Sequence, residues 1–402
     1  MNIIFLTLTR VNSIAFRGIY TDLMRKFRDE GHQVYMVVSS ERRFDEQRGL
    51  LEIDGVKVLR VKIPNVQKTN VVEKGIGTLM MEPLYKRAIK KYFKDVPFGL
   101  ILYSTPPITF NNVVRYLKKK NPQAVSYLLL KDIFPQNAVD MKMFSKNSLF
   151  YWLFRRKEKQ LYQVSDFIGC MSPANMEFVK KHNDFVNPEI VELAPNSLEV
   201  VERKPVDKLA VRKRLGLPVD KKLFVYGGNL GVPQGIPFMI KCLDACAKFN
   251  DCHFIIVGGG TEKKRIDEWI AHGAPSNVQF MERLPKKDYD DMVSACDVGM
   301  IFLDHRFTIP NYPSRLIPYL DFSLPVLVCS DPNTDVGKIA QDNGYGFWCE
   351  SNNVQDFVGC VEKLAGMDHA GLNEMGKRGR RFYEENYDVN VTYKAIAKHL
   401  EH

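Results

Sequence analysis

The chain has 402 residues, 45% of them apolar and 26% charged, which allows two sizeable hydrophobic cores and is ordinary for a globular protein. No uninterrupted apolar run reaches about 18 residues, so no transmembrane helix is expected, and residues 1–8 are expected to form a strand rather than a signal peptide. The eight cysteines include no Cys-x-x-Cys pair, which favours reduced thiols in a cytoplasmic protein.

The net charge of +10 belongs to the first half of the chain. Residues 1–200 contain 31 Lys and Arg against 20 Asp and Glu, whereas residues 201–402 contain 26 against 27. Such an excess suits an anionic membrane surface or a diphosphate-bearing acceptor, although each basic cluster alone also suits a solvated helix face. Nucleic acid is not expected as a partner, because no recognised nucleic-acid-binding module accompanies the charge.

Strand-like and helix-like runs alternate along the whole chain, which predicts parallel sheets wrapped in helices. The expected fold is α/β, with two doubly wound, Rossmann-like domains that meet near residue 200 and face each other across a cleft. Strands are expected in the first half at residues 3–8, 34–38, 56–63, 100–103, 125–130 and 167–171. In the second half they are expected at residues 223–226, 253–257, 278–281, 298–303 and 326–329.

Three places in the first half carry candidate functions. Asp132 follows a buried strand, where a carboxylate would position an acceptor hydroxyl or balance developing positive charge; alternatively it caps a short turn before Pro135. Arg17 and Gly18 lie at a helix start and are candidates for contact with a phosphate or an acceptor. The aromatic run 149–154, which precedes basic residues at 155–159, suits either a membrane-interface element or a core-facing helix.

Two glycine-rich turns follow strands in the second half. Residues 224–231 read Phe-Val-Tyr-Gly-Gly-Asn-Leu-Gly and lead into a helix-like run at 237–243. Glycines let the backbone approach a ligand closely, and the N–H groups of a helix start favour an anion, so this loop predicts a phosphate site. Residues 257–262, Val-Gly-Gly-Gly-Thr-Glu, repeat the pattern, although alone they also suit a plain strand-to-helix turn.

Residues 310–320, Pro-Asn-Tyr-Pro-Ser-Arg-Leu-Ile-Pro-Tyr-Leu, add a cation to this region. Ser314 is predicted to cap a helix, with Arg315 in its first turn. A cation there opposes the helix dipole at a cost of about 0.3–1 kcal/mol when exposed. The placement makes sense if an anion lies between Arg315 and the helix start; alternatively, Arg315 is an ordinary surface residue.

The order of these segments resembles the C-terminal half of a family-4 retaining glycosyltransferase with the two-domain GT-B fold. Ser-Thr-Pro-Pro at 104–107, Lys-Asp-Ile-Phe-Pro-Gln-Asn at 131–137 and the run 153–173 are similar to its polysaccharide-assembly branch, nearest to fucosamine-transferase-like enzymes of capsule and O-antigen synthesis. Residues 382–387 resemble the closing region of the family. This resemblance implies an acceptor domain at 1–200, a donor domain at 201–379, and a last helix at 380–402 that packs back on the first domain.

The resemblance implies a role for each matching residue. Arg315 would stabilise the leaving diphosphate and, with Asp132, is expected to be catalytic. Gln234 stands where the wider family often has lysine, and Asn229 stands near its usual arginine, so Arg315 would supply the charge that the loop lacks. The other expected donor-binding residues are Gly227, Gly228, Leu230, Gly231, Gly258, Gly259, Pro313 and Ser314, with Arg283 and Leu284 beside the nucleobase.

One departure from the family concerns two glutamates that much of it possesses. Pro310 and Pro318 occupy their positions, so the usual carboxylate contacts to the donor sugar and its ribose must be replaced. A donor with fewer hydroxyls, such as an N-acetylated deoxy sugar, is consistent with this change. No metal motif is present, and no cofactor is expected, since helix ends and Arg315 can neutralise a diphosphate.

The expected function is a retaining transfer of a sugar from a nucleotide sugar, UDP-linked, to a polyprenyl-diphosphate-linked saccharide. The protein would be cytoplasmic and peripheral, with the anionic inner face of the cytoplasmic membrane as a further partner. Two alternatives stay open. One is a nucleotide-sugar epimerase on the same scaffold, which would need an internal acid and base; the other is a non-catalytic nucleotide-sugar-binding subunit, which the missing glutamates suggest.

Overall fold

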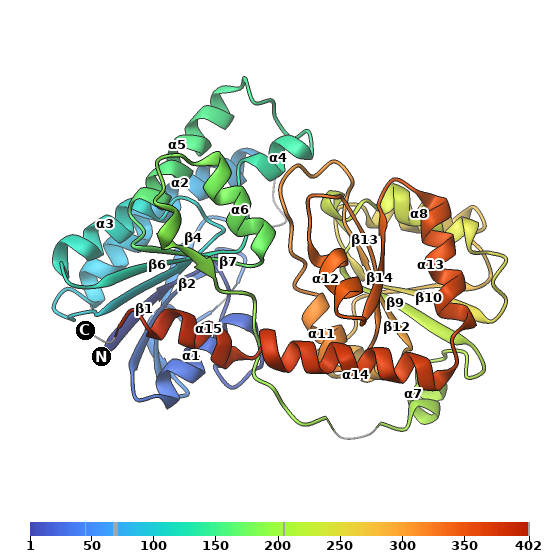
Figure 1. Ribbon diagram of the computed structural model, residues 1–402. Coiled ribbons are helices and arrows are strands. Elements are labelled where there is room, and N and C mark those ends of the chain that lie inside the picture. The colour runs from blue at the N-terminus through green and yellow to red at the C-terminus, as the bar shows by residue number, and fades with distance from the viewer. Residues whose placement is uncertain (45, 67–70, 204–205, 401–402) are drawn as a thin grey trace. The chain divides into compact units, whose positions relative to one another are not determined.

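The computed structural model describes residues 1–44, 46–66, 71–203 and 206–400, which form two compact units (Figure 1). Met1–Glu199 and Tyr387–His402 form the first unit, and Val200–Asn386 forms the second. The chain therefore leaves the first unit close to the expected boundary. It returns at Tyr387 rather than at residue 380, because the helix that contains residues 380–386 belongs to the second unit.

The first unit is built on one eight-stranded sheet in the order β3-β4-β2-β1-β5-β6-β7-β8. Its pairs are parallel, except that β3 runs antiparallel to β4. The edge strands β3 and β8 are absent from the sequence-based expectation, and the six central ones agree with it to within about three residues. The strands are β1 (Asn2–Leu6), β2 (Gln33–Glu41), β3 (Gly49–Ile53), β4 (Val56–Ile63), β5 (Leu100–Ser104), β6 (Val125–Leu130), β7 (Phe167–Cys170) and β8 (Val191–Leu193).

Helices flank both faces of this sheet (Figure 1). Ser172 caps one of them, since its side chain accepts a hydrogen bond from the backbone N–H of Asn175. The helices are α1 (Ile19–Asp29), α2 (Val71–Tyr92), α3 (Asn111–Lys120), α4 (Gln136–Asp140), α5 (Leu149–Gln163), α6 (Pro173–His182), the 3-10 turn η1 (Pro188–Ile190) and α15 (Val389–Ala397).

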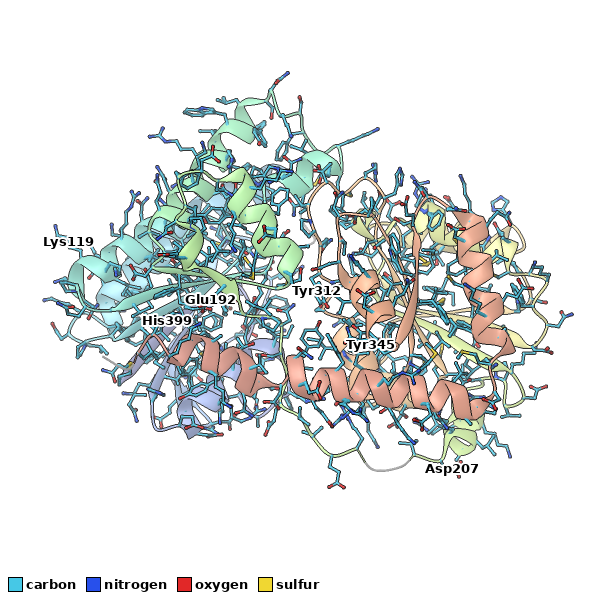
Figure 2. All side chains as sticks on the ribbon, viewed as in Figure 1. Lys119, Glu192, Asp207, Tyr312, Tyr345 and His399 are labelled. Atoms are coloured by element: carbon cyan, nitrogen blue, oxygen red, sulfur yellow. The ribbon has the colours of Figure 1, made fainter. Side chains whose placement is uncertain are left out.

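The returning helix α15 completes the core of the first unit. Ile396 is fully buried in that core, and the ring of Tyr393 packs edge-on against Phe27 at 4.9 Å between centroids. Just beyond the helix, His399 Nε2 lies 3.1 Å from a carboxylate oxygen of Glu192, in the strand β8 (Figure 2). The last segment is therefore part of the first hydrophobic core.

The second unit has a six-stranded sheet in the order β11-β10-β9-β12-β13-β14, parallel throughout. Apolar side chains from its strands and from α8 and α13 form the core on one face. Because the strands are parallel, the loops that follow them line one edge of the sheet. The strands are β9 (Lys222–Asn229), β10 (Cys252–Gly259), β11 (Val278–Met281), β12 (Val298–Phe302), β13 (Val326–Ser330) and β14 (Gly346–Glu350).

The helices of the second unit lie on both faces of its sheet, with α8 and α13 on one and α11 and α12 on the other (Figure 1). They are α7 (Lys208–Arg214), the 3-10 turn η2 (Val232–Gln234), α8 (Ile236–Ala245), α9 (Lys263–Ala271), α10 (Lys286–Ala295), α11 (Leu316–Asp321), α12 (Val336–Asp342), α13 (Val354–Gly366) and α14 (His369–Asn386).

Candidate functional site

The two glycine turns of the second unit pack against each other at the carboxyl edge of its sheet. Gly258 pairs in register with Gly228, and a Cβ atom on Gly258 would lie 1.9 Å from the carbonyl oxygen of Gly228. Their φ angles are +133° at Gly228 and +152° at Gly258, a region that residues with side chains rarely adopt. Close approach and backbone conformation therefore both require glycine here.

Gly227 makes room for two tyrosines that the sequence did not connect with the site. Its N–H donates a hydrogen bond to Tyr319 Oη at 3.0 Å, and a Cβ atom on Gly227 would lie 2.0 Å from Tyr289 Oη. Burial raises the pKa of Tyr289 to about 12, so its hydroxyl keeps its proton at neutral pH. Gly227 thus shapes the site through its aromatic neighbours.

Arg315 is a half-buried cation that forms no ion pair with the residues that the structure describes. Its guanidinium carbon lies 4.5 Å from the ring centroid of Tyr226, and a Cβ atom on Gly228 would lie 3.6 Å from the same carbon. Its Nη1 atom is buried and has no hydrogen-bond partner there. An unsatisfied buried donor costs about 1–3 kcal/mol. The arrangement therefore favours an anion beside Arg315 and Gly228.

The rest of the loop is held by its own hydrogen bonds. The Asn229 side-chain amide donates to Gln234 Oε1 at 3.0 Å, and the N–H of Gly231 donates to the same oxygen at 3.2 Å. Leu230 is fully buried in the core, and its N–H donates to the carbonyl of Gly259 at 3.1 Å. These contacts fix the shape of the loop without adding charge to it.

Ser314 does not cap a helix, so this expectation is wrong. The helix α11 begins at Leu316 after Arg315, and no side chain caps it. The backbone supplies the turn instead, because the N–H of Leu316 donates to the carbonyl of Pro313 at 3.2 Å. Arg315 consequently precedes the helix rather than lying in its first turn, while Ser314 is exposed and Pro313 is buried.

Arg283 and Leu284 lie on the segment between β11 and α10, at the same edge of the sheet as the glycine turns. The side chain of Arg283 is exposed, and that of Leu284 is half-buried. Arg283 has no ion pair with any described residue, so its guanidinium group is accessible to a ligand.

In the first unit, Asp132 is a half-buried residue that follows β6, with its carboxyl group turned away from solvent. It accepts a hydrogen bond from the Asn137 side-chain amide at 2.7 Å, and its backbone N–H donates to Thr105 Oγ1 at 3.1 Å. Burial of the carboxyl raises the pKa of Asp132 to about 6, although the Asn137 bond opposes this. Burial also lowers the pKa of the neighbouring Lys131 to about 7. Groups that titrate near neutral pH are frequent at functional sites.

Arg17 and Gly18 lie immediately before α1 and are occupied by local contacts. Arg17 Nε donates to the carbonyl oxygen of Glu199 at 3.1 Å, within the first unit. The N–H of Gly18 donates to the side chain of Asp22 at 2.9 Å. Arg17 therefore ties the start of α1 to the end of the first unit's main segment, whereas the Gly18 bond stays within the first turn of α1.

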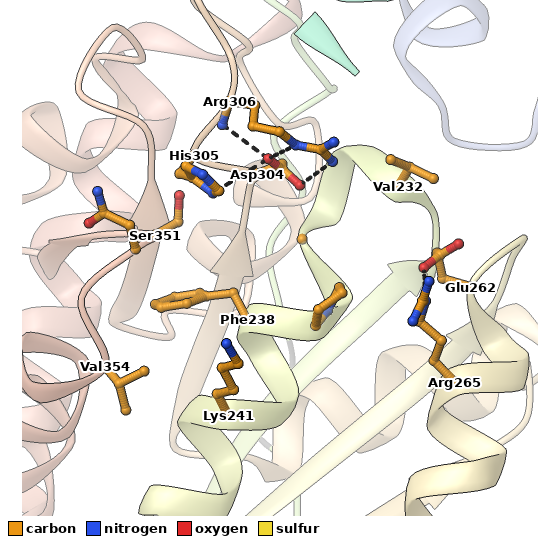
Figure 3. Close-up of a pocket in the computed structure, with 13 residues that line it drawn as sticks. Val232, Phe238, Lys241, Glu262, Arg265, Asp304, His305, Arg306, Ser351 and Val354 are labelled. Atoms are coloured by element: carbon orange, nitrogen blue, oxygen red, sulfur yellow. Dashed lines mark hydrogen bonds and ion pairs between the residues drawn. The ribbon is translucent and has the colours of Figure 1, made fainter. Parts of the chain in front are cut away.

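A pocket of about 560 Å³ opens beside the start of α8 (Figure 3). Asp304, which follows β12, is buried at its wall and receives hydrogen bonds from Arg306 Nε and Nη2 at 2.8 and 2.7 Å. The neighbouring His305 is exposed to the pocket. The sequence reasoning did not assign Asp304 or Arg306, and the only signal was a charged run directly after an apolar strand.

Three further properties of the described residues concern metal binding, membrane spans and thiols. Among them, no group of three or more His, Cys, Asp or Glu side chains could hold a metal ion. None of their helices is both long and apolar enough to cross a membrane. All eight cysteines are free thiols and are buried.

Residues 207–382 match the family described as "Glycosyl transferases group 1". The chain is 22% identical over 351 residues to the "Probable glycosyltransferase WbjE" of Pseudomonas aeruginosa, covering 84% of this chain and 82% of that protein. It is 26% identical over 185 residues to the "Putative colanic acid biosynthesis glycosyl transferase WcaI" of Escherichia coli K12, covering 44% of each.

Solved structures match nearly the whole chain. Sucrose-phosphate synthase from Thermosynechococcus elongatus superposes with a TM-score of 0.78 at 15% identity, covering 99% of this chain and 97% of that one. Anabaena HepE in complex with UDP-glucose gives a TM-score of 0.70 at 15% identity, covering 100% and 99%. The expected α/β fold of the GT-B class, with two parallel-sheet domains, is confirmed.

Proposed function

We propose that this chain transfers a sugar from a nucleotide sugar to a lipid-linked saccharide, with retention of configuration, because its residues 207–382 match the family described as "Glycosyl transferases group 1". The observation that carries the proposal concerns Arg315. Its buried Nη1 atom has no hydrogen-bond acceptor among the described residues, and its guanidinium group lies beside Gly228. A donor diphosphate would supply both the acceptor oxygens and the negative charge that these surroundings lack.

The proposed donor is UDP-linked. HepE, which shares the fold, was solved with UDP-glucose, and Arg283 and Leu284, at the same sheet edge as the glycine turns, are the residues proposed to contact the nucleobase. An N-acetylated deoxy sugar is proposed because Pro310 and Pro318 offer no carboxylate for sugar hydroxyls. The relative WcaI is named for colanic acid biosynthesis, which supports a role in polysaccharide assembly of the capsule or O-antigen type.

In the proposed reaction, the bond between the anomeric carbon and the diphosphate oxygen breaks, and a bond to an acceptor hydroxyl oxygen forms on the same face. The hydroxyl proton passes to the leaving diphosphate, so no separate base is needed. Arg315 would stabilise the charge that develops on the diphosphate. Gly228 lets the phosphates approach the backbone. Asp132 would position the acceptor hydroxyl, and neither a metal nor another cofactor takes part.

The proposed acceptor is a saccharide on a polyprenyl diphosphate, at the inner face of the cytoplasmic membrane. The first 200 residues carry 31 Lys and Arg against 20 Asp and Glu, a balance that attracts an anionic acceptor and an anionic bilayer. The protein would be cytoplasmic and peripheral to the membrane.

Thermal unfolding with a panel of nucleotide sugars tests the donor. A UDP-sugar at about 100 times its Kd should stabilise the native state by about 2.7 kcal/mol, and the stabilisation should be lost on Arg315→Ala. Turnover is then measured with a lipid-linked acceptor. Isomerisation of the donor without an acceptor would favour an epimerase, binding without turnover would favour a non-catalytic subunit, and no binding by any nucleotide sugar would refute the proposal.

The pH dependence of transfer tests Asp132. Its carboxyl is ionised above its pKa of about 6, so kcat/KM should fall about tenfold per pH unit below pH 6 and level off above it. Asp132→Asn should lower the plateau about 100-fold and remove this acid limb. Asn137→Ala removes a hydrogen bond that favours the ionised form, so it should move the limb to higher pH. An acid limb that persists in Asp132→Asn would exclude this role.

A further inference from the structure

An unusual concentration of exposed apolar side chains lies at the start of α5. Five large apolar residues between positions 143 and 153 have 44% to 69% of their surface exposed: Met143, Leu149, Phe150, Trp152 and Leu153. We refer to these five as the apolar patch. Elsewhere in the described chain such residues occur singly or in pairs, which is normal for a protein surface. A contiguous patch generally marks an interaction surface.

The geometry of α5 explains why three residues of the apolar patch face outward. At about 100° per residue, Leu149, Trp152 and Leu153 lie on one side of the helix. The opposite side is anchored, because Phe154 packs on Phe134 at 5.0 Å between ring centroids and Leu161 is fully buried. The helix therefore cannot rotate to bury these three side chains without breaking the contacts of Phe154 and Leu161. Figure 1 shows this segment at the periphery of the first unit.

Cations flank the apolar patch along the chain, and this stretch of sequence contains no carboxylate. The sequence has no Asp or Glu between Asp140 and Glu158. Lys142, Lys146 and Arg156 are exposed and form no ion pair with described residues, and Arg156 lies 5.7 Å from the ring of Trp152. Apolar side chains with cations beside them complement the acyl chains and the anionic headgroups of a bilayer surface.

We propose that residues 142–156 dock this protein on an anionic lipid bilayer, with the apolar patch inserted at the headgroup boundary. The inference rests on the proposed function, in which a lipid-linked acceptor brings the enzyme to a membrane. An apolar partner protein would need only the apolar side chains. The unpaired cations of this segment, with no carboxylate among them, instead favour an anionic surface. Trp152 provides the aromatic anchor typical of membrane interfaces.

Co-sedimentation with lipid vesicles tests this proposal. Wild type is expected to bind vesicles that contain phosphatidylglycerol and to bind zwitterionic phosphatidylcholine vesicles at least 10-fold more weakly. Phe150→Ser/Trp152→Ser and Lys146→Glu/Arg156→Glu should each weaken binding to the anionic vesicles about 10-fold or more. Because Trp152 is one of three tryptophans, brominated lipids should also quench fluorescence in wild type and much less in Trp152→Phe.

Matched control variants distinguish the effect of the patch from general effects of net charge and exposed apolar surface. Lys119→Glu/Lys120→Glu makes the same change of net charge on the exposed end of α3 (Figure 2), and Leu209→Ser removes an exposed apolar residue from α7. Both should bind vesicles within about twofold of wild type. Equal weakening by these controls would overturn the assignment, as would patch variants that bind normally. If the patch variants changed the oligomeric state but bound vesicles normally, the patch would instead be a contact surface between two copies of this chain.

A failure of the docking proposal can be distinguished from a failure of the proposed transferase function. Donor binding is measured in vesicle-free solution, where the patch variants should show the same thermal shift with nucleotide sugar as wild type. Vesicle binding without any donor binding would refute the transferase proposal alone. Donor binding and turnover without vesicle binding would refute the docking proposal alone.

Discussion

Replacement of Arg315 by methionine is expected to lower kcat/KM for sugar transfer by about 10²–10³-fold while leaving the melting temperature equal to wild type or higher. The loss follows from removing the cation that would stabilise the leaving diphosphate. The retained stability follows from the buried Nη1, which has no hydrogen-bond partner among the described residues. Initial rates with donor and acceptor, together with thermal unfolding of the free protein, measure both effects.

Two variants make this result specific. Arg315→Lys keeps the charge but not the planar group, so it should recover only part of the activity. Arg381→Ala removes an exposed arginine from α14 and should change neither quantity. If Arg315→Met were strongly destabilised, with activity falling only in proportion to the folded fraction, Arg315 would be a structural residue instead of a ligand for phosphate.

Gly258→Ala is expected to destabilise the second unit by at least about 2 kcal/mol, whereas Gly259→Ala should change its stability by less than about 1 kcal/mol. A Cβ atom at Gly258 would collide with the carbonyl of Gly228 at 1.9 Å, and the φ of +152° adds strain. At Gly259, no atom lies within 4 Å of an added Cβ. Urea unfolding followed by circular dichroism gives both values.

Comparing the alanine variants of these two adjacent glycines therefore tests the local geometry of the site, because the chemical change is the same at both positions. The collision involves two backbone segments, so no side-chain rotation relieves it. Gly258→Ala should also weaken donor binding, since Gly228 would have to move beside Arg315. Equal stability of the two alanine variants would contradict the close pairing of the two turns.

Central elements of the fold follow from the sequence because their apolar runs are uninterrupted. The strand β6 was expected at 125–130 and occupies Val125–Leu130, and β13 extends only one residue beyond its expected end. The strands β3 and β14 were not expected. Their residues are partly exposed, so the apolar signal is broken, and pairing with a neighbouring strand decides their structure.

The candidate site was less accessible to sequence reasoning. Glycine turns and a nearby arginine are visible as local patterns, but the environment of Arg315 is not. Tyr289 and Tyr319 reach Gly227 from helices far along the chain, and no local spacing encodes that approach. The Ser314 cap failed for a related reason, since backbone hydrogen bonds made the turn without any side chain.

The return of the chain at Tyr387 has a consequence for biosynthesis. The core of the first unit includes Val389 and Ile396, which the ribosome adds only after the whole of the second unit has been made. Domains generally fold as units when their sequence has emerged. The second unit thus has its complete sequence before the first, and the first unit keeps part of its apolar surface uncovered until residues 387–400 have been added.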